Sequence, residues 1–209
     1  WLYRGAFTPQ TLDLIKQEYK TGEARLVTES GGITRKIKKR KHFFPNQDGA
    51  LNLALQHPEF VGRLEKTIGL PEGQALKLST ALKPEYRLYE IGGEMQWHRD
   101  TVLTTPAQYE VVITLFNSSD SQLLWRHRDK PDDINRADTS ANSVTVVRAG
   151  GIEHAVSPVT MGNRVIIKAA YEVIKVEDQV PVDVGKGPPG HFPKMTTIPK
   201  HPVYNLLLN

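Results

Sequence analysis

Two histidines and one aspartate have the residue types and the spacing of a metal-binding set. His98 and Asp100 are two residues apart, and side chains at that spacing in an extended segment point to the same side. His154 lies far downstream, where a second strand can bring it beside the first pair. Two imidazoles and one carboxylate hold Fe(II) on one face and leave open positions for other ligands. We therefore expect an open metal site, of the kind that does chemistry, at these three residues.

The His-x-Asp pattern alone has little specificity, because the chain contains it twice. The second copy, His127 to Asp129, lies in a polar stretch, so we interpret His127 as a loop residue. His-Arg-Asp also opens the catalytic loop of protein kinases, which place Asn five residues after the Asp. Here those positions hold Thr105 and Ile134, and no glycine-rich loop or strand lysine precedes them. These differences exclude a kinase.

The surroundings of the first copy favour a site that also binds a carboxylate. A predicted strand runs through Tyr89, turns at two glycines and then presents His98 and Asp100. Arg164 follows His154 by ten positions, and a proline and a glycine between them predict a turn. His154 and Arg164 would then face one cavity from neighbouring strands. A guanidinium in such a cavity binds a carboxylate through two parallel hydrogen bonds.

Together these patterns resemble the 2-oxoglutarate- and Fe(II)-dependent dioxygenases, specifically the prolyl 4-hydroxylase-like branch. The shared pattern is Tyr-x-x-Gly, His-x-Asp and His-x-Val-x-Pro-Val-x-x-Gly-x-Arg. The resemblance covers residues 2–173 and is strongest over 86–100 and 143–171. It implies a mainly β domain with flanking helices, which is a double-stranded β-helix or distorted jelly roll. It also implies a hydroxylase of an unactivated C–H bond in a peptidyl or amino-acid substrate, with release of succinate and CO2.

The resemblance implies a role for each of these residues, carried over by position. His98, Asp100 and His154 would be the Fe(II) ligands. Arg164 would bind the distal carboxylate of 2-oxoglutarate, and Tyr89 would line the same pocket. Dioxygen is the other cosubstrate that the family uses, ascorbate can support turnover, and no catalytic group beyond the metal ligands is implied. The protein would supply orientation and a water-poor pocket.

Departures from the family pattern limit what the sequence says about the substrate. Arg164 stands where collagen-type prolyl hydroxylases usually have lysine, and Ala170 stands where nucleic-acid demethylases carry a second arginine. The second difference disfavours a nucleic-acid substrate. A peptide, a protein, a free amino acid and other small metabolites stay open, with a peptide or protein preferred. Trp97 either packs in the core or shapes the substrate mouth, together with Arg99.

One segment, residues 35–41, carries six Lys and Arg residues and no acidic residue. The whole chain has 27 basic and 23 acidic residues, and only 21 of the basic residues lie outside this segment. The net charge of +4 therefore resides there. We expect an exposed strand or loop, since runs of charge are usually solvated. The rival hypothesis is a non-catalytic β-helix binding module that uses segment 35–41 for nucleic acid or an acidic partner.

Helices are expected first along the chain and strands after them. Thr8 and Pro9 predict a helix that ends at Gly22, and residues 58–68 have a second helical pattern. From residue 75 onward the period becomes two, which predicts strands over 75–82, 86–91, 109–116, 122–125, 143–147 and 164–173. Short strands with few helix-sized gaps favour an antiparallel sandwich or jelly roll. The segments 101–108 and 126–142 are expected to be flexible loops that can clamp an extended peptide.

Length and composition indicate one domain, residues 1–175, followed by a Pro-rich extended tail, residues 176–209. The absence of cysteine excludes disulfides, thiolate ligands and cysteine nucleophiles, and it favours an intracellular location. No apolar run approaches the about 20 residues that span a bilayer, so no membrane partner is expected. The chain begins with Trp1 rather than Met, so we expect a trimmed or partial chain. Nothing in the sequence indicates the oligomeric state.

Overall fold

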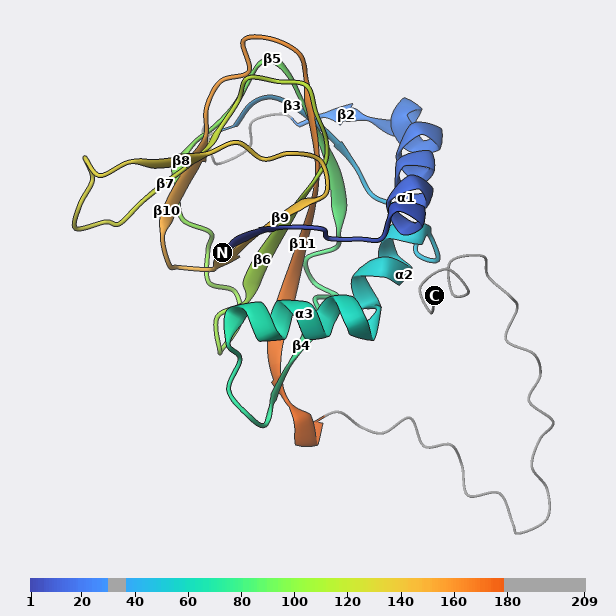
Figure 1. Cartoon of the computed structure of the whole chain (residues 1–209), viewed down its shortest axis with the longest axis vertical. Coiled ribbons are helices and arrows are strands. Elements are labelled where there is room, and N and C mark those ends of the chain that lie inside the picture. Colours follow the sequence, from blue (N-terminus) through green and yellow to red (C-terminus); the bar gives the residue numbers. More distant parts are fainter. Residues whose placement is uncertain (30–36, 179–209) are drawn as a thin grey trace, which may run out of the picture.

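The structure is a computed structural model that describes residues 1–29 and 37–178 (Figure 1). The helices and 3-10 turns are α1 (Pro9–Gly22), η1 (Glu23–Arg25), α2 (Ala50–Gln56), α3 (Pro58–Ile68) and η2 (Val176–Asp178). The strands are β1 (Leu2–Arg4), β2 (Val27–Thr28), β3 (Ile37–Phe43), β4 (Gln74–Leu78), β5 (Glu85–His98), β6 (Tyr109–Asn117), β7 (Leu123–Arg126), β8 (Asn135–Ala137), β9 (Ser143–Arg148), β10 (Glu153–Val156) and β11 (Arg164–Lys175). Within the described residues these strands form one sheet, and every pairing is antiparallel.

Strand β5 is shared by the two halves of this sheet and bends between them. Its first part pairs with β11 over Glu85–Tyr89, and its last part pairs with β10 over Met95–His98. Gly92 at the bend has a φ of +82°, and a Cβ on Gly93 would meet the Glu90 carbonyl oxygen at 2.8 Å, so both positions require glycine. The sheet order β1-β9-β6-β11-β5-β10-β7-β8 curls into a barrel-like double layer with the helices along its outside (Figure 1). This arrangement confirms the predicted double-stranded β-helix with flanking helices.

The two predicted helices form where their capping residues place them. At the start of α1 the Thr8 hydroxyl accepts a hydrogen bond from Thr11 N, and Pro9 occupies the first turn, where its missing N–H costs nothing. Helix α3 begins at a proline in the same way and ends at Gly69, whose φ of +72° suits a left-handed cap. Both helices pack an apolar face against the sheet, and this contact forms the main hydrophobic core.

Alternation along the strands decides which side chains enter the barrel. Tyr86 of β5 is fully buried under α1, and a side chain buried in this way contributes about 1.5–3 kcal/mol. Its neighbours on the strand, Arg87 and Tyr89, therefore project to the opposite, inner face. By the same rule, the residues of β11 that line the interior are Arg164, Ile166 and Lys168.

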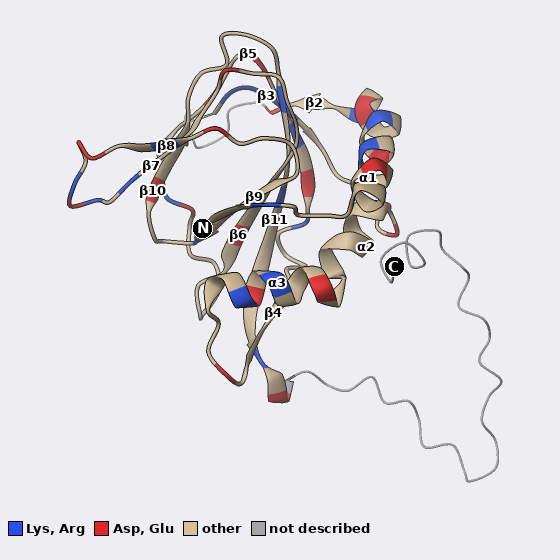
Figure 2. Ribbon diagram, in the orientation of Figure 1, with Lys and Arg blue, Asp and Glu red and all other residues tan. Residues whose placement is uncertain are grey.

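Segment 35–41 is expected to be a strand or a loop, and its described part lies in strand β3, whereas β8 and β10 are not among the strands expected from period two. Strand β3 is the described part of the basic segment, and Figure 2 shows its basic positions beside β5, which carries acidic ones. Strand β8 is three residues long and forms a hairpin with β7 inside the segment expected to be a loop. Strand β10 has only four residues. Each is too short or too polar to show an apolar alternation, and β3 and β10 are also paired with β5, which is distant from both in sequence.

The predicted Pro-rich tail, residues 176–209, lies outside the described residues except for η2. Across residues 1–29 and 37–178, no helix combines the length and the apolar character that crossing a membrane requires.

Candidate active site

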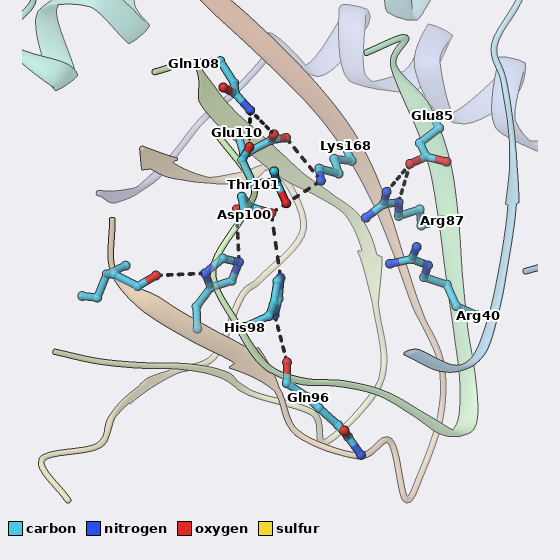
Figure 3. A network of polar contacts seen from close by, with 12 residues as sticks. Arg40, Glu85, Arg87, Gln96, His98, Asp100, Thr101, Gln108, Glu110 and Lys168 are labelled. Atoms are coloured by element: carbon cyan, nitrogen blue, oxygen red, sulfur yellow. Dashed lines mark hydrogen bonds and ion pairs between the residues drawn. The ribbon is translucent and has the colours of Figure 1, made fainter. Parts of the chain in front are cut away.

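The structure brings His98, Asp100 and His154 together, and Figure 3 shows His98 beside Asp100. His98 is the last residue of β5 and lies opposite His154 of β10 in the strand register, with ring centroids 4.2 Å apart. Asp100 follows β5 and places one oxygen 3.8 Å from His98 Nε2 and the other 3.5 Å from His154 Nε2. One candidate ligand atom from each residue lies within 4.8 Å of the other two. Two imidazoles and a carboxylate on one side of a cavity fit a divalent metal such as Fe(II).

Backbone carbonyls orient both imidazoles in the same way. His98 Nδ1 lies 2.8 Å from the Gln96 carbonyl oxygen, and His154 Nδ1 lies 3.4 Å from that of Ile152. When each Nδ1 carries the proton and donates to its carbonyl, each Nε2 presents a lone pair to Asp100 and to the space between the rings. Burial, together with the nearby His154, lowers the pKa of His98 to about 4, so this imidazole is neutral at neutral pH. A neutral imidazole is the form that binds metals.

Arg164 is the first residue of β11 and is buried in the same cavity. Its side chain is 2% exposed, and its Nε and Nη1 have no hydrogen-bond partner among the described residues. Burial lowers its pKa, and Tyr89, its partner in the β5–β11 register, opposes that shift. An arginine keeps its charge in proteins, so this guanidinium is a buried cation with free donors. Leaving such donors without acceptors costs free energy, and a carboxylate bound by two hydrogen bonds would satisfy them.

Arg40 of β3 is also buried in this cavity, which corrects the expectation that the whole basic segment is exposed. Its side chain is 2% exposed, its Nε donates to Glu29 at 2.6 Å, and its Nη1 donates to the Tyr89 hydroxyl at 3.3 Å. Burial alone would lower the pKa of Arg40, but Tyr89 and Glu29 outweigh it and raise the pKa. The neighbouring Lys38 and Lys41 stay at the surface, where they pair with acidic residues of β5. The error arises because β3 pairs with β5, which no local pattern indicates.

We call the space between these groups the metal cavity. It has a volume of about 60 Å³ and is lined by the three candidate ligands, by Tyr89 and Arg164, and by Arg40, Arg87, Met95, Glu110, Val112, Leu123, Thr145, Val147, Val156, Ile166 and Lys168. Three of these lining residues, Arg87, Glu110 and Lys168, are not among the site residues expected from the sequence. Lys168 and Arg87 share the inner face of their strands with Arg164 and Tyr89, so period two offered a signal for both.

Lys168 links the candidate metal ligands to the far wall of the cavity (Figure 3). Its Nζ lies 3.7 Å from Asp100 Oδ1 and 3.3 Å from Glu110 Oε2. On the adjacent strand Arg87 donates to Glu85 from Nε, at 2.7 Å, and from Nη2. Burial would raise the pKa of Glu85, but Arg87 and then His42 outweigh it and hold that pKa below its ordinary value. Charged pairs therefore surround the metal ligands on the β5–β11 side.

The residues expected at the substrate mouth lie outside the metal cavity. Trp97 is half-buried, and Arg126 lies over its ring with the guanidinium carbon 4.2 Å from the ring centroid. Arg99 is exposed, and His127 lies in the connection between β7 and β8, as expected for a loop residue. The loop 101–108 is anchored by the buried Gln108, which accepts a hydrogen bond from Leu103 N at 3.0 Å and donates to the Thr101 carbonyl at 2.8 Å.

Similarity to known proteins is found at the level of the fold and not of the sequence. No protein-family model matches the sequence, and no curated protein matches it. Among solved structures, a prolyl-4-hydroxylase from Pseudomonas putida superposes with a TM-score of 0.62 at 17% identity, over 82% of this chain and 91% of that one. A prolyl hydroxylase from Trichoplax adhaerens, in complex with a hypoxia inducible factor peptide fragment, gives 0.61 at 12% identity over 82% of both chains. The α-ketoglutarate-dependent epimerase SnoN of nogalamycin biosynthesis gives 0.63 at 15% identity, over 92% and 86%.

These likenesses show that the chain has the fold of the 2-oxoglutarate and Fe(II) oxygenases, including their prolyl hydroxylases. The fold expected from the sequence resemblance is thereby confirmed. Two of these solved structures are prolyl hydroxylases and the third is an epimerase, so the shared fold alone does not define a reaction or a substrate.

Proposed function

We propose that this protein is an Fe(II)- and 2-oxoglutarate-dependent dioxygenase. The reaction would hydroxylate an unactivated C–H bond of a peptidyl or amino-acid substrate, with release of succinate and CO2. The observation that carries the proposal is the combination of a two-histidine, one-carboxylate set with Arg164, a buried guanidinium that has free donors toward the same cavity. A structural metal site would not need the guanidinium, and a simple anion site would not need the imidazoles.

The residues present fit both groups that the fold implies. His98, Asp100 and His154 would hold the metal through one atom each, which leaves positions open for further ligands. Arg164 would pair with the distal carboxylate of 2-oxoglutarate, and Arg40 holds the Tyr89 hydroxyl beside it. Bound iron with 2-oxoglutarate and dioxygen would supply the oxidising chemistry. Apolar side chains such as Val112, Leu123 and Ile166 line the same space and would exclude bulk water.

The rival function, a binding module that uses segment 35–41, gains no support from the described part of that segment. Arg40 is committed inside the barrel to Glu29, and Lys38 and Lys41 are paired with carboxylates at the surface. Neutralised cations contribute little to the attraction of phosphates. Lys39 is exposed and has no ion pair among the described residues, so it is the one described cation of the segment left unneutralised; the cations at 35 and 36 lie outside the described residues.

Anaerobic titration tests the proposal. We expect one equivalent of Fe(II) together with 2-oxoglutarate to produce the weak visible metal-to-ligand charge-transfer band of this chelate, and His98→Ala to abolish it. Asp129→Ala, which alters the second His-x-Asp triplet in the β7–β8 connection, is the matched control and should leave the band unchanged. A band that survives in His98→Ala, or no band in the unmodified protein, would contradict the assignment.

A further inference from the structure

Three charged side chains line both the metal cavity and a larger recess beside it. The recess has a volume of about 240 Å³ and lies where Arg87, Glu110 and Lys168 separate it from the candidate metal ligands. Its remaining lining holds one further charge of each sign, Lys83 and Glu85, and apolar groups that include Phe44 and Leu82. A substrate that occupies the recess would therefore meet these three charges next to the metal.

Glu110 and Lys168 retain hydrogen-bonding capacity toward this space. Glu110 is 4% exposed, and its Oε2 accepts no well-directed hydrogen bond from the described residues, although Lys168 Nζ lies 3.3 Å away. Lys168 is shared with Asp100, at 3.7 Å. Both separations exceed the about 2.7–2.9 Å of a strong charge-assisted hydrogen bond. If Glu110 and Lys168 served only to stabilise the sheet, we would expect them to form a direct hydrogen bond of that length.

Arg87 adds a further cationic hydrogen-bond donor to this wall. Its Nε and Nη2 both bind Glu85, and its Nη1 makes no hydrogen bond to the described residues (Figure 3). The wall between the recess and the metal therefore offers one acceptor carboxylate oxygen and donors from a guanidinium and an ammonium. Glu110 is buried with one oxygen unpaired, while the side chains of Arg87 and Lys168 are 12% and 25% exposed, so this wall keeps an acceptor and donors open to a ligand that carries both signs.

We propose that the substrate is a free zwitterion, an α-amino acid or a small molecule with the same two charges. Its ammonium group binds Glu110, and its carboxylate binds Arg87 and Lys168. This inference rests on the proposed function and names the substrate class of that same site. A residue inside a peptide has lost both the α-ammonium and the α-carboxylate charge and would leave these groups unsatisfied. The recess is also below the about 300–1,000 Å³ of sites for drug-sized ligands, which suits a small molecule.

Calorimetry with protein loaded with Mn(II) and 2-oxoglutarate tests the inference without turnover. The probes are the free L-α-amino acids and, for each, its N-acetyl and its carboxamide derivative. We expect at least one free amino acid to bind, and the loss of either charge to weaken binding by about tenfold or more, because each removes a charge-assisted hydrogen bond. Equal binding of an N-acetyl or carboxamide derivative would overturn the inference, and so would a panel in which no free amino acid binds.

A protein-side test complements this panel. Glu110→Gln keeps the shape of the side chain. It should lower the affinity for the free amino acid by about tenfold or more and lower the affinity for its N-acetyl derivative much less. Glu177→Gln, a surface variant in η2, is the matched control and should bind as the unmodified protein does. Identical losses for both ligands in Glu110→Gln would overturn the inference, and the derivative panel remains decisive if this variant does not fold. Failure of the unmodified protein to bind Mn(II) and 2-oxoglutarate would instead contradict the proposed function.

Discussion

Arg40 on β3 and Arg164 on β11 are buried to the same extent in one cavity, yet they differ in how their charge is satisfied. Arg40 binds Glu29 and the Tyr89 hydroxyl, whereas Arg164 has two nitrogens without a hydrogen-bond partner among the described residues. A buried charge that is paired internally holds structure, and one left with open donors is prepared for a ligand. We therefore infer a structural role for Arg40 and a ligand-binding one for Arg164, although residue type and burial are the same for both.

The largest effect is expected for Arg164→Ala measured on ligand affinity. Removing the guanidinium deletes two charge-assisted hydrogen bonds to the distal carboxylate, so 2-oxoglutarate affinity should fall by about 100-fold or more. The thermal midpoint should change little, because the side chain lost is not paired within the described protein. Calorimetric titration of 2-oxoglutarate with Mn(II) gives the affinity. Unchanged affinity would show that the free donors of Arg164 serve another ligand.

Arg40→Ala should reduce the stability of the protein more than its affinity for 2-oxoglutarate. It leaves Glu29 and the Tyr89 hydroxyl without their partner, so the free energy of unfolding should fall by about 2–3 kcal/mol, less than for a fully buried pair because Glu29 is partly exposed. The 2-oxoglutarate affinity should fall much less than in Arg164→Ala. Urea unfolding and the same titration measure both quantities. A larger loss of affinity than of stability would break the distinction between the two arginines.

A third arginine, Arg87, sharpens the comparison through its carboxylate partner. The pKa of Glu85 is lowered in the folded state, so its ionised form contributes stability that is present above its unfolded pKa and is lost as the pH falls through the lowered folded pKa. Glu85→Gln should therefore destabilise the protein by about 1 kcal/mol near pH 7, and the difference should vanish in acid. Urea midpoints compared between neutral and acidic pH check this. A difference that persists unchanged in acid would mean that charge is not its origin.

The smallest effect is expected at the surface of the same strand that buries Arg40. Lys41 pairs with Glu90, and both side chains are substantially exposed. Solvent screens such pairs, so Lys41→Ala should change the free energy of unfolding by less than about 1 kcal/mol. Urea unfolding in low and high salt provides the measurement. A loss comparable to that of Arg40→Ala would show that the whole basic segment, and not one inward residue, supports the fold.

The sequence predicts well those features that depend on local spacing. The His98–Asp100 pair follows from extended geometry. The interval between His154 and Arg164 correctly predicts one shared cavity, but the expectation of neighbouring strands is wrong, because β10 and β11 each pair with β5 and not with each other. The helix starts at Pro9 and Pro58 are equally local, because each rests on a cap next to the helix it begins.

Features that depend on distant pairing are not predictable in the same way. Arg40 is buried because it lies opposite Tyr89 in the β3–β5 register, and nothing near residue 40 indicates that partner. Glu110 and Lys168 meet because β6 and β11 are adjacent strands, although the two residues are far apart in sequence. His154 is predictable as a candidate ligand. The four-residue strand that positions it, however, forms only by pairing with β5 on one side and β7 on the other.

The glycine bend in β5 has a consequence for the length of the cosubstrate. Tyr89, in register with Arg164, lies on one arm of the strand, and His98 lies on the other. The backbone between them therefore fixes the distance between the candidate carboxylate anchor, Arg164, and the candidate metal ligand His98. Under the proposed function, this distance would favour a diacid of matching chain length. Inserting or deleting a residue at the bend would change the distance and therefore the length of diacid that fits.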